Sequence, residues 1–156
     1  MTEPATPTAS AMSVTSMTPA LPRTAPVIGL DNQFWWDGAA IAELRIQECA
    51  DCGRLRHPPG PMCPACHSLN WHHRRASGRG TVHSYTVHHA RFADLPNPYL
   101  VALIDLEEGV RVVSNLVDIE PAAVCIGLPV EVVFRHSGGA QTIPLFRPAA
   151  TGARPE

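Results

Sequence analysis

The sequence has no apolar run of the roughly eighteen residues that a membrane-spanning helix needs, although 45% of its 156 residues are hydrophobic. It also lacks the continuous apolar segment of a secretory signal, since residues 1–27 contain five prolines and only scattered large apolar side chains. These two absences predict a cytoplasmic protein without a membrane span.

Positive charge is scarce as well. There is no lysine, which we attribute to genomic base composition, and the formal net charge is −2. Because binding to duplex DNA rests on a concentrated positive surface, this balance argues against duplex DNA as the main partner. The stretch from Arg54 to Arg91 differs, because it holds six arginines, seven of the eight histidines and no Asp or Glu. It predicts contact with phosphates of nucleic acid or coenzyme A, contact with an acidic protein, or only a solvated face.

No catalytic motif stands out. The sequence has no phosphate-cradling glycine loop and no nucleophile elbow. The pairs His72-His73 and His88-His89 lack an accompanying carboxylate, and neighbours on a strand point to opposite faces. We therefore expect no active site within this chain.

What the sequence does contain is a double CxxC motif, in which Cys49 and Cys52 are separated by ten residues from Cys63 and Cys66. Each two-residue spacer lets a tight turn present two thiolates to one metal ion, and zinc prefers a tetrahedron of such ligands. With all four positions filled by protein, the spacing predicts a structural zinc site with no place for an activated water. Redox chemistry and paired disulfides are the alternatives. The fifth cysteine, Cys125, is interpreted as a small buried apolar residue.

The first part of the chain is predicted to hold a tail, a helical hairpin and the ribbon. Residues 1–28 are rich in Pro, Thr, Ser and Ala, which predicts a disordered tail. Residues 29–76 are predicted to form the helical hairpin and zinc ribbon. Its first helix is expected over 32–37 and is expected to end at Gly38, before a second turn over 39–43.

Residues 77–148 show the alternation and turn signals of a small β-barrel. The predicted strands are 81–89, 99–106, 110–117, 130–135 and 142–147, with one helical turn at 121–124. Glycines in Ser77-Gly78-Arg79-Gly80 predict a sharp bend or bulge before the first strand. Five strands and one small helix in about seventy residues suit an OB-fold, and a generic small barrel or sandwich is the alternative. Residues 149–156 are predicted to be a flexible tail.

Several motifs in a fixed order resemble one family. They are Phe34-Trp35-Trp36-Asp37-Gly38, the double CxxC with Pro58-Pro59 inside it, Ser77-Gly78-Arg79-Gly80-Thr81-Val82, Pro98-Tyr99 and Gly127-Leu128-Pro129-Val130-Glu131-Val132. From about residue 31 to residue 148, the chain resembles the zinc-ribbon OB-fold family known as domain of unknown function thirty-five. One departure is His67, which stands where the family commonly has a glycine at a position that often needs a positive φ.

The resemblance implies a mainly β protein with a helical hairpin, a rubredoxin-like zinc ribbon and a five-stranded OB-fold. It further implies a non-catalytic accessory subunit of a thiolase-like enzyme or aldolase of acyl-CoA metabolism. In some members the partner is a retro-aldolase of steroid side-chain breakdown, and in others it is an acetoacetyl-CoA thiolase. Such a subunit holds or completes its partner and helps to shape the acyl-CoA channel.

Two sets of residues are candidates for contacts with partners. Three consecutive large rings on a short helix point in different directions, so at least one is expected to face outward and anchor an interface. These candidate partner-binding residues are Phe34, Trp35 and Trp36. In the alternative interpretation, they only pack the hairpin onto its own ribbon. The candidates for reaching the phosphates of acyl-CoA are Arg74, Arg79 and Arg91.

A nucleic-acid-binding module is the alternative function, because zinc ribbons and OB-folds both bind oligonucleotides in other settings. The predicted barrel offers few aromatic rings for stacking. From Asp94 to Glu131 it also carries seven acidic residues against the single base Arg111, which is a poor groove for phosphates. We therefore prefer the accessory subunit.

Overall fold

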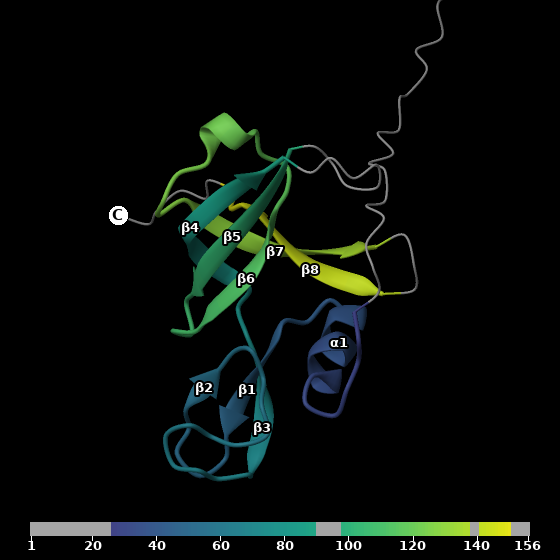
Figure 1. Ribbon diagram of the computed structural model, residues 1–156, viewed down its shortest axis with the longest axis vertical. Coiled ribbons are helices and arrows are strands. Elements are labelled where there is room, and N and C mark those ends of the chain that lie inside the picture. The colour runs from purple at the N-terminus through teal and green to yellow at the C-terminus, as the bar shows by residue number, and fades with distance from the viewer. Residues whose placement is uncertain (1–25, 90–97, 138–140, 151–156) are drawn as a thin grey trace, which may run out of the picture.

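The computed structural model describes residues 26–89, 98–137 and 141–150 (Figure 1). Nearly all of the predicted N-terminal tail and most of the C-terminal one lie outside these ranges. In chain order the elements are α1 (Gln33–Ala40), β1 (Arg45–Cys49), β2 (Leu55–Arg56), β3 (Trp71–Arg75), β4 (Arg79–His88), β5 (Tyr99–Leu106), β6 (Arg111–Leu116), the 3₁₀ helix η1 (Pro121–Ala123), β7 (Pro129–His136) and β8 (Thr142–Pro148). Within the described residues, no helix is long and apolar enough to span a bilayer.

The first sheet is a three-stranded ribbon with the order β2-β1-β3, and both pairs are antiparallel. Strand β1 lies in the centre, which explains why even its polar residues Gln47 and Glu48 are buried. The first CxxC begins at Cys49, the last residue of β1, and the second lies between β2 and β3. Figure 1 shows the ribbon below the barrel, with α1 beside it.

Helix α1 is longer than expected, because it passes through Gly38 and continues to Ala40. The second helix of the predicted hairpin is absent from the described residues, where 41–42 form a turn. A Cβ at position 38 would lie 2.7 Å from Arg45 Cδ and 2.8 Å from the Glu43 carbonyl oxygen. Gly38 is therefore needed for a close approach of α1 to the chain entering β1, and it does not end the helix.

The second sheet closes into a barrel with the order β4-β5-β6-β8-β7, which confirms the predicted five-stranded OB-fold. Its neighbours pair antiparallel except β6 and β8, which are parallel and meet at Leu116 and Phe146. Strand β5 alternates half-buried and buried residues along its whole length, as a strand with one face toward a core should. The predicted helical turn is confirmed as η1 between β6 and β7.

The bend predicted between ribbon and barrel is confirmed at Gly78, which has φ of 76°. Its carbonyl accepts a 2.7 Å hydrogen bond from Val132 N of β7, and a Cβ there would overlap Val132 Cγ1. Only glycine satisfies both the positive φ and this close approach. The irregularity in the β4–β5 ladder lies further along, between Val82 and Ser84.

One hydrophobic cluster joins the ribbon to the barrel. Leu44, Ile46 and Ala76 of the ribbon half are buried in the same cluster as Ile104 and Phe146 of the barrel. The shared core fixes the ribbon against the barrel. The domain boundary near residue 77 stays a prediction, because no break in the core marks it.

The interpretation of Cys125 was wrong, because this residue is exposed. It lies on the loop between η1 and β7, where the neighbouring Val124 supplies the buried side chain with 5% exposure. The sequence Ala-Ala-Val-Cys-Ile-Gly did not show which of its apolar residues faces the core.

Candidate metal centre and the adjacent cavity

The two CxxC motifs form two knuckles of the same geometry. The N–H of Gly53 donates to the Cys49 carbonyl at 2.9 Å, and the N–H of His67 donates to the Cys63 carbonyl at 2.9 Å. Gly53 and His67 have φ of 71° and 59°. His67 thus adopts the positive φ of its position although it is not a glycine.

The knuckles bring the four sulfurs together. The Cys49 and Cys66 sulfurs lie 3.5 Å apart, those of Cys52 and Cys63 lie 3.6 Å apart, and all four lie within 4.8 Å of one another. These separations are far longer than the about 2.05 Å of a disulfide. Ligands at about 2.3 Å from a tetrahedral zinc ion are roughly 3.8 Å apart, so the cluster has the size that zinc requires.

The electrostatics of the thiols also suit a cation. Backbone N–H groups of Cys66 and Ala65 point at the Cys63 sulfur and lower the pKa of that thiol to about 6. At Cys66 the backbone N–H of Ser68 is the largest single effect and lowers the pKa of the thiol. The other three cysteine sulfurs and burial together have the opposite effect, and the net result is a pKa raised to about 12. Four thiolates in so small a volume repel one another unless a cation lies between them.

The three aromatic residues of α1 all make contacts within the chain. Phe34 is buried, with its ring centroid 5.1 Å from that of Trp71 and 5.9 Å from that of His73. The ring centroid of Trp35 lies 4.5 Å from that of His57, and Trp36 is half-buried. None of the three belongs to the exposed large apolar side chains of the described residues. Their packing supports the alternative interpretation, and their role in partner binding stays a prediction.

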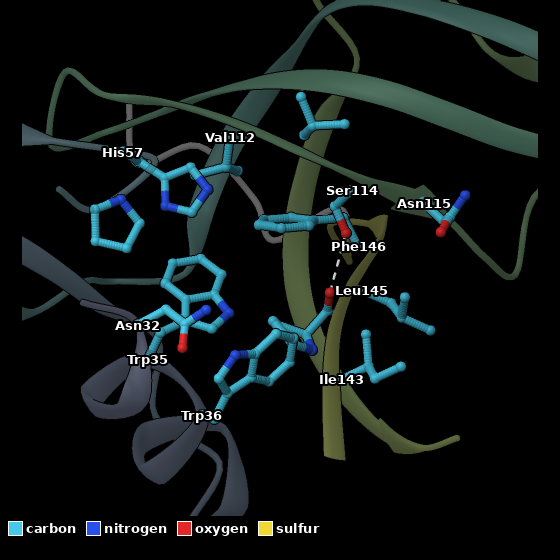
Figure 2. Close-up of a pocket in the computed structure, with 13 residues that line it drawn as sticks. Asn32, Trp35, Trp36, His57, Val112, Ser114, Asn115, Ile143, Leu145 and Phe146 are labelled. Carbon is cyan, nitrogen blue, oxygen red and sulfur yellow. Dashed lines mark hydrogen bonds between the residues drawn. The ribbon is translucent and has the colours of Figure 1, made fainter. Parts of the chain in front are cut away.

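A cavity of about 320 Å³ lies between α1, the loop after β2, and strands β6 and β8. Figure 2 shows Trp35 and Trp36 of α1 facing the strand that carries Leu145 and Phe146. The lining residues are Asn32, Trp35, Trp36, His57, Pro59, Val112, Val113, Ser114, Asn115, Ile143, Pro144, Leu145 and Phe146. None of them is acidic, Arg or Lys. Burial lowers the pKa of His57 to about 4, so its ring is neutral near pH 7.

The wall formed by the loop after β2 is held by one buried amide. Gln47 Oε1 accepts hydrogen bonds from Arg56 Nε at 2.7 Å and Gly60 N at 2.8 Å, while Gln47 Nε2 donates to the Gly60 carbonyl at 3.0 Å. These bonds fix both ends of the segment that carries His57 and Pro59. Sequence analysis missed the cavity because its lining comes from four segments far apart in the chain.

The arginines proposed for acyl-CoA have partners within the chain. Arg74 forms a bidentate pair with Glu48 at 2.9 and 2.6 Å, and Arg79 forms one with Glu107 at 2.9 Å for both bonds. Arg91 lies outside the described residues. The carboxylate of Glu48 on β1 thus lies beside Arg74 of the neighbouring strand β3. This contact is not evident from the sequence, because the two residues are far apart in the chain. A role in binding phosphates stays a prediction.

Two family models match adjacent parts of the chain. Residues 36–72 match the model described as "ChsH2, rubredoxin-like zinc ribbon domain", and residues 73–135 match "ChsH2, C-terminal OB-fold domain". Together they cover both cysteine knuckles and most of the barrel.

Among curated proteins, the chain is 46% identical over 136 residues to the "Probable enoyl-CoA hydratase alpha subunit" of Thermomonospora curvata, covering 86% of this chain and 43% of the relative. It is 44% identical over 110 residues to the "3-oxo-4,17-pregnadiene-20-carboxyl-CoA hydratase alpha subunit" of Mycobacterium tuberculosis, covering 70% and 35%. The chain therefore spans less than half of the length of these two relatives. It is 40% identical over 96 residues to the "DUF35 domain-containing scaffold protein" of Methanothermobacter thermautotrophicus, covering 59% and 71%.

Among solved structures, a chain of the "Ltp2-ChsH2(DUF35) aldolase" superposes with a TM-score of 0.77 at 46% identity, covering 81% of this chain and 100% of that chain. The likeness extends over ribbon and barrel alike. The four cysteines form a rubredoxin-like zinc ribbon, and the resemblance found in the sequence is confirmed. The chain therefore belongs to the DUF35 family, with a ChsH2-type zinc ribbon followed by an OB-fold.

Proposed function

We propose that this chain is a non-catalytic accessory subunit that docks on a thiolase-like aldolase or thiolase of acyl-CoA metabolism, including steroid side-chain metabolism. One observation carries the proposal: the chain matches all of a solved chain of the "Ltp2-ChsH2(DUF35) aldolase" at 46% identity. A relative that covers both ribbon and barrel supports the same role for the same pair of domains.

The four cysteines are proposed to hold one zinc ion with a structural role. Cys49, Cys52, Cys63 and Cys66 would fill every position of a tetrahedron, so no ligand place remains for water or substrate. The knuckles lie at the end of the ribbon away from the barrel (Figure 1). Zinc there would stabilise the sheet on which α1 and the cavity loop pack.

Catalysis by this chain has little support among the described residues. His72 lies 3.3 Å from Glu48, a carboxylate already paired with Arg74, and His73 stacks on Phe34. The carboxylate beside His72 corrects the expectation that this pair lacks one, but neither ring lines the cavity beside α1. Two relatives are named hydratase alpha subunits, but their names describe proteins of more than twice the matched length.

The nucleic-acid-binding alternative receives no support from the barrel. Three of its arginines, Arg79, Arg111 and Arg147, pair with carboxylates on the same surface. A groove for single strands needs uncompensated positive charge beside stacking rings. In the described part of the barrel, these ion pairs remove that charge.

The test is binding to the Ltp2 subunit of the solved relative's complex, measured by titration calorimetry, together with the aldolase activity of each subunit alone and of the mixture. We expect saturable binding, no turnover by this chain alone, and higher activity in the mixture than with Ltp2 alone. Turnover by this chain alone, or salt-sensitive binding of single-stranded DNA without any binding of Ltp2, would contradict the proposal.

A further inference from the structure

The cavity beside α1 has walls that the chain itself holds in place. Ser114 Oγ of β6 donates a 3.0 Å hydrogen bond to the Pro144 carbonyl of β8, so these two strands form one wall. The loop that carries His57 and Pro59 is fixed by the buried amide of Gln47. Because both walls are held by contacts within the chain, the cavity is formed before anything enters it, as in most small-molecule sites.

The amide and hydroxyl side chains of the lining are already used. Asn32 Oδ1 accepts a 2.8 Å hydrogen bond and Asn32 Nδ2 donates a 3.1 Å one, both with the backbone just before α1. Ser114 Oγ bonds to β8, and Asn115 Nδ2 donates to a carbonyl of β5 at 2.8 Å. These groups hold the walls, and the polar groups left for a ligand come from the rings.

Two nitrogen-bearing rings of the lining have hydrogen-bonding capacity that the chain does not use. The ring of His57 contacts Trp35, and in the described part of the chain neither of its nitrogens forms a hydrogen bond. The Nε1 of Trp36 is buried and has no acceptor among the described residues. An indole N–H can only donate, and a neutral imidazole donates through one nitrogen and accepts through the other. The lining thus has more donors than acceptors, and a carbonyl oxygen would complement it.

The lining also disfavours an ionised ligand. It contains no Asp, Glu, Arg or Lys, and burial lowers the pKa of His57 to about 4, so the ring is neutral near pH 7. A carboxylate or phosphate in the cavity would lose its water without gaining an opposite charge, which is costly. The occupant is therefore expected to be uncharged.

The size and shape of the cavity suit more than one ring. Its volume of about 320 Å³ lies within the range of small-molecule sites and is twice the roughly 150 Å³ of an apolar cavity that binds benzene. Figure 2 shows His57 and the two tryptophans on one side and Ile143 and Leu145 on the other, so flat rings would lie between aromatic and aliphatic surfaces. Fused rings are rigid and fill such a space with little loss of conformational freedom.

We propose that the cavity beside α1 binds a small, uncharged fused-ring molecule whose carbonyl oxygen accepts a hydrogen bond from the His57 ring. The rings of the ligand pack against the tryptophans and the apolar side chains of β8, and its oxygen lies at the loop after β2. The site is complete in this chain alone, so the proposal goes beyond the proposed function and does not rest on it.

A side chain of the partner enzyme is the alternative occupant, and it fits less well. The uncharged side chains that carry an acceptor oxygen are those of Ser, Thr, Asn, Gln and Tyr, and only Tyr adds a ring. A single ring, which a cavity of roughly 150 Å³ already accommodates, would leave much of this one empty. A docking segment would also fill the cavity only in the complex, whereas the proposed ligand binds the free chain.

The test uses the full zinc-loaded chain and probes that share one naphthalene ring system. They are 2-acetylnaphthalene, which is uncharged and has a carbonyl, 2-naphthoate, which is charged, and 2-ethylnaphthalene, which has no oxygen. Titration calorimetry should show saturable binding of 2-acetylnaphthalene, and 2-naphthoate should bind at least about tenfold more weakly. No binding of 2-acetylnaphthalene, or a comparable affinity for 2-naphthoate, would overturn the proposal.

His57→Phe tests the hydrogen bond, because phenylalanine keeps a ring beside Trp35 but has no N–H. The affinity for 2-acetylnaphthalene should fall about fivefold, and that for 2-ethylnaphthalene should change by less than about twofold. An equal effect on both probes would show that His57 does not bond to the carbonyl. His136→Phe, at an exposed histidine outside the cavity, is the matched control and should leave both affinities unchanged.

The indole N–H signals in NMR spectra of the unaltered chain locate the probe without relying on a variant. Saturation with 2-acetylnaphthalene should shift the signals of Trp35 and Trp36, while that of Trp71, which does not line the cavity, should move much less. Saturable binding that moves neither the Trp35 nor the Trp36 signal would place the probe elsewhere and contradict the proposal. None of these results bears on binding to the Ltp2 subunit, so the proposed function stands or fails separately.

Discussion

His67 occupies, in the second knuckle, the position that Gly53 occupies in the first. Both residues have positive φ, and both donate a 2.9 Å hydrogen bond to the carbonyl of the first cysteine of their knuckle. A side chain in this left-handed region costs about 1 kcal/mol that glycine avoids. The second knuckle therefore carries backbone strain that the first does not.

Separate substitutions at these two positions should change the free energy of unfolding in opposite directions. His67→Gly should raise the free energy of unfolding by up to about 1 kcal/mol, because it relieves the strain. Gly53→Ala should lower it by about 1 kcal/mol, and only through φ, since nothing lies within 4 Å of the added Cβ. Denaturant unfolding of the zinc-loaded proteins measures both. A loss of stability in His67→Gly would show that the imidazole makes a compensating contact.

Gly78→Ala should destabilise the protein by about 3 kcal/mol, because strain at φ of 76° adds to the overlap of the new Cβ with Val132 Cγ1. Gly109→Ala is the matched control, since it has φ of 81° and open space around the added Cβ. The control should lose only about 1 kcal/mol. Thermal unfolding of the two variants separates strain from overlap, and equal losses would contradict the packing described at the junction.

Gln47→Ala should lower the free energy of unfolding by about 2–4 kcal/mol. Gln47 is 1% exposed, and its loss leaves Arg56 Nε and both backbone groups of Gly60 without these partners. Gln33→Ala, on the exposed side of α1, is the control and should change stability by less than about 0.5 kcal/mol. Denaturant unfolding makes the comparison, and similar values for the two variants would show that the amide does not hold the loop.

Stability should fall as the pH drops from about 6.5 to about 4, in part because of His57. Burial lowers the pKa of His57 from 6.5 to about 4, so in this range the unfolded chain binds a proton that the folded chain does not. Across the whole range this difference amounts to roughly 3 kcal/mol.

His57→Gln removes the titrating group, so the loss over this pH range should be smaller by about that amount. Loss of zinc at low pH affects both proteins and cancels in the comparison. His136→Gln, at an exposed histidine, is the control and shows how replacing a histidine outside the cavity changes the pH dependence of stability. Equal pH profiles for the wild type and His57→Gln would mean that the ring is not buried in solution.

Local patterns were enough to predict the main elements. The ten-residue gap between the two CxxC motifs predicted the sulfur cluster. The turn residues before and after residues 99–106 predicted β5 with its observed bounds, Tyr99–Leu106. Turn residues placed η1 and the bend at Gly78. Each of these features depends on neighbours in the chain, which is the information that a pattern contains.

Features that depend on distant contacts were missed or misread. Gly38 looked like a helix terminator, but the side chain of Arg45 is what requires it. The basic stretch looked uncompensated, because Glu48 precedes it in the chain and meets Arg74 only across the ribbon. The cavity depends on α1 packing against β8, and no local motif encodes that contact.

Native mass spectrometry of this chain co-expressed with the Ltp2 subunit of the solved relative's complex tests the central claim most directly, because one spectrum reports both the partner and the metal. The account predicts an assembly that contains both subunits, with one zinc ion for each copy of this chain. Separate subunits, or a copy of this chain that stays folded in the assembly without zinc, would contradict it.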